Sequence, residues 1–236
     1  MNLRVLLPSA FTIGNMVCGF LAITTAFRGE LSASAWLILL GAVLDGLDGT
    51  VARTLQVDSR FGREFDSFSD FVTFGVAPMV LVYDFLLGSI GFWTWVVCGL
   101  FLIAGAFRLV RHNMTQSSLP SGSYTGLPIT AAGITMAGYM LFELHYFGRF
   151  QSLWLLLGII AFLAVFMVST MRFIRFPLIP GEYPKWLKFL LLILVSLAIL
   201  IRPQVMIFAI SVVYIIAIIS IESVKLISGK ISRSRT

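Results

Sequence analysis

Long apolar stretches separated by short polar links dominate the chain. Each stretch is close to the roughly 20 residues that a helix needs to cross the hydrocarbon core of a bilayer. Three of the links, at residues 28–30, 88–90 and 202–203, are very short, which predicts antiparallel neighbouring helices. We predict about eight membrane-spanning helices, which run from Pro8 to Phe27, Leu31 to Ala52, Gly62 to Leu87, Gly91 to Val110, Gly126 to Phe147, Ser152 to Thr170, Trp186 to Ile201 and Pro203 to Ile227.

The composition agrees with this pattern. Of the 236 residues, 58% are hydrophobic and only 12% are charged, whereas a soluble domain has about 25% charged residues. The mean hydropathy of +0.97 excludes a soluble enzyme, a disordered chain and a coiled coil. We therefore expect an all-α fold, a polytopic membrane helix bundle that forms a single domain over residues 1–236.

The basic residues predict the orientation of this bundle. With eight spans both termini lie on one side, and 14 of the 17 Lys and Arg residues fall in the links and ends on that side. Only Arg28, Arg149 and Arg202 fall on the other side. Because cytoplasmic loops collect Lys and Arg, we predict that both termini are cytoplasmic. The excess of Lys and Arg in cytoplasmic loops then explains the net charge of +6, and we expect no nucleic-acid partner.

Two polar stripes occupy the second and third predicted spans. Helical spacing forms one stripe from Asp45, Asp48, Gly49 and Ala52 and the other from Gly62, Asp66 and Asp70. A short basic loop turns the chain between them, so the stripes can face each other. We predict that four carboxylates converge just inside the cytoplasmic side of the membrane.

Four converging carboxylates require compensation at membrane depth. Two divalent cations, Mg²⁺ or Mn²⁺, held roughly 3.5–4 Å apart by oxygen ligands would supply it and would suit a phosphoryl substrate. The small Gly49 and Ala52 leave a slot beside the metals, and Arg53 at its mouth is a natural partner for a diphosphate. The alternative is that the acids are membrane-interface residues paired with nearby arginines, which we favour for Asp58 and Glu64 because they lie off the stripes.

These residues match a known motif, DxxDGxxARx8GxxxDxxxD, at every fixed position from Asp45 to Asp70. On this motif the chain resembles the CDP-alcohol phosphotransferase family. Further stretches, one of which overlaps the end of the motif, are similar to the bacterial phosphatidylserine synthases of that family, namely residues 8–20, 66–78, 107–113, 126–128 and 167–177. One departure is His112, where the pattern leads us to expect an aromatic residue such as Phe.

The resemblance implies a reaction in which CDP-diacylglycerol and L-serine give phosphatidylserine and CMP. It implies that Asp45, Asp48 and Asp66 hold two metals, and that Asp70 completes the second metal site and is the general base. It also implies that the CDP-lipid is contacted by Ser9, Thr12, Asn15, Gly49, Arg53 and Ser59. By the same resemblance we expect a homodimer among membrane lipids, in a bacterial inner membrane with its active site facing the cytoplasm.

Arg108 and Arg111 lie at the cytoplasmic end of the fourth predicted span, level with the carboxylates. A serine carboxylate needs a cation, and a guanidinium offers a bidentate one. The two arginines are therefore candidates for the serine pocket. Both could equally be anchors on the cytoplasmic side of the membrane.

Glu143 and Glu222 lie inside apolar stretches away from the motif. An acid within a membrane span is a functional candidate by default. Since the main cluster accounts for the chemistry, we interpret both as membrane-interface residues.

Two other interpretations of the carboxylates stay open. The acceptor could be another alcohol, such as glycerol 3-phosphate, inositol phosphate or choline, although a phosphorylated acceptor would want a denser basic pocket. A cation-coupled transporter could use the same acids for ions, but transporters often show paired broken helices near mid-membrane. Here the acids occupy one adjacent helix pair.

Overall fold

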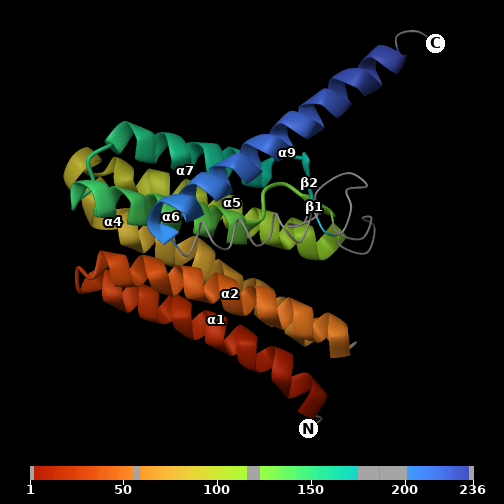
Figure 1. The fold of residues 1–236 in the computed structure, drawn as a ribbon, viewed down its shortest axis with the longest axis horizontal. Coiled ribbons are helices and arrows are strands. Elements are labelled where there is room, and N and C mark those ends of the chain that lie inside the picture. Colours follow the sequence, from red (N-terminus) through yellow and green to blue (C-terminus); the bar gives the residue numbers. More distant parts are fainter. Residues whose placement is uncertain (1–2, 56–58, 116–122, 175–185, 187–200, 234–236) are drawn as a thin grey trace.

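The computed structural model describes residues 3–55, 59–115, 123–174, 186 and 201–233. Helices make up nearly all of this part of the chain (Figure 1). Their bounds are α1 Leu3–Phe27, α2 Leu31–Leu55, α3 Arg60–Asp70, α4 Ala77–Ile90, α5 Trp93–Thr115, α6 Ile129–Phe147, α7 Leu153–Val168 and α9 Pro203–Arg233, with a π-helical turn, η1 Phe71–Val76, between α3 and α4. The predicted helical class is confirmed.

The predicted helix boundaries are correct at the link between α1 and α2 and wrong at the link after α4. A turn at residues 28–30 joins α1 to α2, and Gly29 adopts a φ of 78° there, as the short link predicted. The link predicted at residues 88–90 is wrong, because these residues form the last turn of α4. That helix ends at Ile90 and is capped by Gly91, whose φ of 54° favours glycine, so the turn follows the predicted link.

Five helices in the described ranges are long and apolar enough to cross a membrane. They comprise Ser9–Phe27, Leu31–Ala52, Phe61–Ile90, Trp93–Thr115 and Pro203–Ser220. The helices α6 and α7 occupy the fifth and sixth predicted segments. The segment predicted at Trp186–Ile201 lies almost wholly outside the described residues. The total of eight spans and the side on which the termini lie therefore stay predictions.

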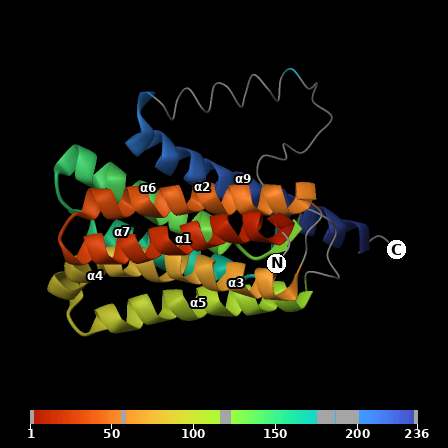
Figure 2. The same ribbon diagram turned by 90° about the horizontal axis from the view of Figure 1, so that it is seen from below.

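The helix α6 lies at the centre of the bundle and is buried along most of its length. It packs against α2, α9 and η1. On another side of the molecule, α3 lies between α1 and α5 (Figure 2). This arrangement sets the helix that carries the second half of the motif against the first helix of the chain.

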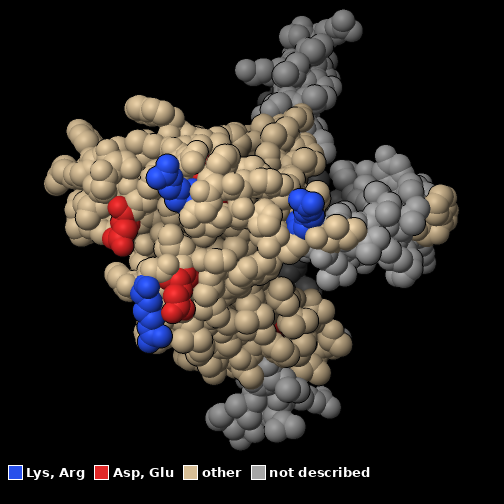
Figure 3. All heavy atoms as spheres, turned by 60° about the vertical axis from the view of Figure 1, so that its left-hand side comes forward, with Lys and Arg blue, Asp and Glu red and all other residues tan. Residues whose placement is uncertain are grey.

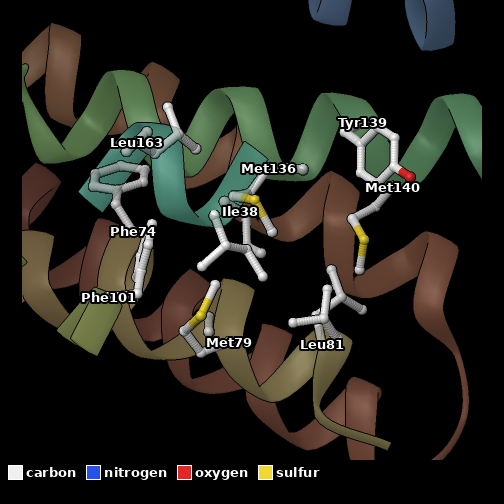
Figure 4. Packing of buried hydrophobic residues seen from close by; sticks show 14 of the residues in the cluster. Ile38, Phe74, Met79, Leu81, Phe101, Met136, Tyr139, Met140 and Leu163 are labelled. Atoms are coloured by element: carbon white, nitrogen blue, oxygen red, sulfur yellow. The ribbon is translucent and has the colours of Figure 1, made fainter. Parts of the chain in front are cut away.

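One apolar core joins these elements (Figure 4). Phe74 of η1, Phe101 of α5 and Leu163 of α7 meet on one side of it, and Ile38 of α2 and Met136 of α6 lie beside them. Gly133 permits the close approach of α6 to η1, because a Cβ at this position would lie 2.7 Å from the Cβ of Phe74. Small residues at helix crossings let the backbones of membrane helices approach each other closely.

The outer surface of the bundle is largely apolar. Large side chains such as Phe20, Ile103 and Trp154 are 61%, 67% and 83% exposed. On the face drawn in Figure 3, the described surface carries only scattered charged side chains. A soluble monomer rarely exposes so much contiguous apolar area, whereas a bilayer accommodates it.

A two-stranded antiparallel ribbon is the feature that the helical prediction missed. It pairs β1 Ser123–Thr125 with β2 Arg172–Ile174. Gly126 follows β1 with a φ of 78° and donates its N–H to the carbonyl of Met171 at 2.8 Å. The ribbon thereby connects the chain before α6 to the chain after α7.

Glu143 was predicted to lie at the membrane interface, but its side chain is 1% exposed. Tyr139 donates its hydroxyl to Oε1 at 3.1 Å, and the backbone N–H of Gln151 donates to Oε2 at 2.9 Å. The carboxylate therefore links the end of α6 to the start of α7. Its role in the fold is to satisfy polar groups that would otherwise be buried without partners.

Replacing Glu143 by Ala should lower the thermal unfolding midpoint in detergent, because each buried polar group left without a partner costs about 1–3 kcal/mol. The change Glu143→Gln should cost less, since its amide oxygen still accepts one hydrogen bond. The exposed Glu30 provides the control through Glu30→Ala. Equal midpoints for Glu143→Ala and Glu30→Ala would contradict this role.

Candidate active site

Three carboxylates from two neighbouring helices meet at one point of the bundle. On α2, Asp45 and Asp48 are three residues apart and share a face, and Asp66 comes from α3. Each of the three offers an oxygen that lies within 4.8 Å of the other two. Asp48 is buried and the other two are half-buried. The expectation that the two polar stripes face each other agrees with this geometry.

The donor set fits a hard divalent cation. Three carboxylates so close together repel one another, and burial from water makes their ionised forms costly. One oxygen of Asp66, Oδ1, is buried without a hydrogen-bond partner among the described residues. A buried carboxylate oxygen that accepts no hydrogen bond and lies close to other carboxylates is a suitable ligand for a hard cation such as Mg²⁺ or Mn²⁺.

Asp70 lies beside this cluster but is not part of the three-carboxylate group. It is 7% exposed and lies within electrostatic range of Asp45 and Asp66. The side chain of Asn15 on α1 donates an N–H to Asp70 Oδ1 at 3.1 Å. The four predicted carboxylates are thus brought together, with Asp48 and Asp70 both buried and Asp45 and Asp66 half-buried.

The helix α1 supplies polar support to the acids from one face. Thr12 donates its hydroxyl to Asp48 Oδ2 at 2.9 Å, and Asn15, three residues later, bonds Asp70. Both side chains are buried. From the sequence we expected Thr12 and Asn15 to contact the nucleotide, and the structure adds that they hydrogen-bond the carboxylates directly. Their three-residue spacing, shared with Ser9, is the sequence signal for this face.

The remaining predicted nucleotide contacts lie close to the acids along the chain. Gly49 is half-buried and follows Asp48 directly. The hydroxyl of Ser59 caps α3 by accepting the N–H of Gly62 at 3.0 Å. The side chain of Arg53, near the end of α2, lies outside the described part of the structure.

Two supporting residues were missed by the sequence analysis. Thr130, at the start of α6, lies 3.4 Å from Asp45 Oδ2 through its hydroxyl. Ser69 donates its hydroxyl to the backbone carbonyl of Thr12 at 3.0 Å, which ties α3 to α1 next to Asp70. Thr130 has no spacing relation to the acids, because it reaches Asp45 only through tertiary packing. Ser69 lies three residues after Asp66 on α3, but its partner on α1 is likewise set by tertiary packing.

The two candidate arginines of the serine pocket have different surroundings. Arg108 is 4% exposed and lies within electrostatic range of Asp70. The guanidinium of Arg111 donates to a set of backbone carbonyls. These belong to Thr125 at 2.9 Å, Met167 at 3.1 Å, Val168 at 2.8 Å and Ser169 at 2.8 Å. The contacts of Arg111 therefore favour a structural role at the end of α7.

Asn113 has a structural position that the sequence did not reveal. Its amide donates to Glu64 Oε2 at 3.2 Å and to Ser67 Oγ at 3.0 Å. These bonds fasten the end of α5 to the face of α3 that does not carry Asp66 and Asp70. Glu64, which lies off the predicted stripes, is thus accounted for outside the cluster.

A model of one protein family matches residues 5–168, which is well over half of the chain, and its description is CDP-alcohol phosphatidyltransferase. The chain belongs to the CDP-alcohol phosphatidyltransferase family. It is a transferase of phospholipid biosynthesis. The matched region contains all residues proposed from the sequence for the site, and α9 lies beyond it.

Curated relatives support this assignment. A CDP-diacylglycerol–serine O-phosphatidyltransferase from Helicobacter pylori is 36% identical over 201 residues, which cover 84% of this chain and 83% of that protein. An enzyme of the same name from Bacillus subtilis is 41% identical over 131 residues, 55% of this chain and 72% of that protein. An archaetidylserine synthase from Methanothermobacter thermautotrophicus is 32% identical over 175 residues, 72% of this chain and 70% of that protein.

Adding Mn²⁺ or Mg²⁺ should raise the thermal unfolding midpoint of this family member, because a ligand present at 100 times its dissociation constant stabilises the folded state by about 2.7 kcal/mol. The change Asp66→Asn should remove most of that rise. A matched control is Asp84→Asn, which alters an exposed acid on α4. A rise of equal size in both variants would contradict cation binding at the cluster.

Proposed function

We propose that the protein is a phosphatidylserine synthase, which transfers the phosphatidyl group of CDP-diacylglycerol to the hydroxyl of L-serine and releases CMP. The observation that carries the proposal is the meeting of Asp45, Asp48 and Asp66, with Asp70 beside them, in a member of this family. Serine is supported as the acceptor by the relatives, since the names of the Helicobacter and Methanothermobacter enzymes share serine and differ in the lipid.

The proposed cofactors are two divalent cations, Mg²⁺ or Mn²⁺. The residues that would hold them are Asp45, Asp48 and Asp66, with Asp70 completing the second site. When bound, such ions neutralise charge on the phosphoryl oxygens and on departing CMP. The buried Oδ1 of Asp66 supports a cation at this point.

Asp70 is proposed as the general base, because an alcohol is a weak nucleophile unless its proton is removed as attack begins. The serine Oγ forms a bond to the lipid-side phosphorus, the phosphorus–oxygen bond to CMP breaks in line with it, and the hydroxyl proton passes to Asp70. Since Asn15 donates to Oδ1, we assign the proton to Oδ2. Asp70 is 7% exposed, so bulk water has little access to this side chain.

The CDP-lipid would lie across the ends of α1, α2 and α3, where its phosphates face the carboxylates. Ser9 and Thr12 would approach it from α1, where the buried Asn15 would act on it through Asp70. Gly49, Arg53 and Ser59 would approach it from the end of α2 and the start of α3. The half-buried glycine after Asp48 supports close approach of a ligand to the backbone of α2. The lipid tails would stay in the bilayer.

Arg108 is the residue that we propose for the serine carboxylate. It is buried, lies near Asp70 and carries the charge that a carboxylate needs. The distribution of Lys and Arg supports an active site that faces the cytoplasm, with both termini on that side and eight spans in one domain. A homodimer in a bacterial inner membrane completes the proposal.

Purified protein should release CMP from CDP-diacylglycerol only when a divalent cation and serine are present. The assay uses serine, glycerol 3-phosphate, inositol phosphate and choline in parallel. Asp70→Asn should lower kcat by about 10²–10⁴-fold, the usual contribution of a general base, while leaving the unfolding midpoint near that of the wild type. Turnover with another alcohol instead of serine would show that serine is not the acceptor, and it would leave the proposed transfer chemistry unchanged. Folded protein without turnover on any alcohol would contradict the enzyme and favour ion transport.

Arg108→Lys should raise KM for serine about tenfold or more, because a charge-assisted bidentate contact is worth about 1.5–3 kcal/mol and an ammonium cannot reproduce it. The KM for CDP-diacylglycerol should change little. A matched control is Arg28→Lys in the exposed turn between α1 and α2. Equal effects on the two KM values would show that Arg108 acts on the fold of the site and does not bind serine.

A further inference from the structure

The helix that carries Asp66 and Asp70 changes geometry directly after Asp70. The turn η1 has π-helical hydrogen bonding, in which the N–H of Ala77 bonds the carbonyl of Val72. Thr73, Phe74 and Gly75 are all buried, so three consecutive residues of this turn face the interior. Single π-helical turns inside longer helices occur frequently at functional sites.

The wider turn places Thr73 between α1 and α2. Two glycines make the space for it, Gly19 on α1 and Gly41 on α2. A Cβ at Gly19 would collide with the Oγ1 of Thr73, and a Cβ at Gly41 would lie 2.6 Å from its Cγ2. Thr73 is fully buried at the junction of three helices, and its position is fixed on both sides by packing.

Thr73 is connected to Asp70 through Asn15. The Thr73 hydroxyl donates to the backbone carbonyl of Asn15 at 2.9 Å. The Asn15 side chain is fully buried and donates to Asp70 Oδ1 at 3.1 Å. A Cβ at Gly41 would also lie 2.9 Å from Asn15 Oδ1, so the small residue on α2 leaves room for the amide as well.

We propose that Thr73 is a positioning residue: wedged between Gly19 and Gly41, its hydroxyl fixes the backbone of α1 at Asn15, and the Asn15 amide in turn fixes the carboxylate of Asp70 for proton transfer. This inference rests on the proposed function, since it assigns Asp70 the role of base. Positioning matters because a displacement of about 1 Å can cost roughly 10²-fold in rate. The hydroxyl acts through geometry and touches no substrate.

The alternative is that Thr73 only fills space in the core. Valine has nearly the volume of threonine and lacks the hydroxyl, so Thr73→Val separates the two roles. Thr73→Ser keeps the hydroxyl and removes the methyl group that packs on Gly41. The matched control is Thr135→Val, because Thr135 is also buried and its hydroxyl also donates to a backbone carbonyl, that of Ala131, within α6.

The experiment measures CMP release, with whichever alcohol of the panel the wild type uses, together with the unfolding midpoint and its rise on adding Mn²⁺. Thr73→Val should lower kcat about tenfold or more, leave both KM values within about twofold, and keep the Mn²⁺-induced rise. Thr73→Ser should recover most of kcat. Asn15→Ala should lower kcat similarly, and the double variant should lose less than the product of the two single losses because the residues act in one chain.

Equal kcat values for Thr73→Val and Thr135→Val would overturn the inference, and so would a loss in Thr73→Val that Thr73→Ser fails to recover. A kcat loss in the double variant equal to the product of the two single losses would contradict the connection through Asn15. These results leave the proposed function untouched, because the wild type stays active. Folded wild type that releases no CMP with any alcohol would overturn the proposed function and this inference together.

Discussion

The structure depends on keeping several carboxylates close together in an otherwise apolar bundle. Asp45, Asp48 and Asp66 each present an oxygen within 4.8 Å of the others, an arrangement that repulsion between the charges opposes. The packing of α2 against α1 and α6, and of α3 against α1, has to supply the free energy that holds the acids there. Several other features serve this arrangement: glycines at the helix crossings, a buried α6, and the Thr12 hydroxyl and Asn15 amide of α1, which donate to the acids.

Much of this arrangement could be predicted from the sequence because it depends on helical periodicity. The spacing of Asp45 and Asp48, and of Asp66 and Asp70, placed each pair on one face of its helix, and the apolar lengths placed both helices in the bundle. The link at residues 88–90 was misplaced because Gly88 continues α4 and the chain reverses at Gly91. The ribbon of β1 and β2 joins segments nearly fifty residues apart, and no local pattern encodes such a pairing.

The residues that surround and hold the carboxylates were harder to predict than the carboxylates themselves. Thr130 contacts Asp45 only because α6 packs against α2, and Ser69 reaches the backbone of Thr12 only because α1 packs against α3. Two arginines three residues apart on α5 also have different surroundings. Periodicity predicts the face on which a residue lies, but the partner on that face comes from tertiary packing. Glu143 illustrates the same limit, since its partners include a backbone N–H that follows the turn after α6.

The hydrogen bonds from the guanidinium of Arg111 to four backbone carbonyls bear on which acceptor the protein can use. They join the last turns of α5 and α7 and the end of β1 into one block. Arg108 lies one helical turn earlier on α5, so this block fixes the wall of the proposed acceptor pocket. If Arg108 binds the carboxylate of the acceptor, its place on α5 sets the distance from that carboxylate to the reacting hydroxyl. A hydroxy acid with a longer chain would then place its hydroxyl at the wrong distance from the phosphorus.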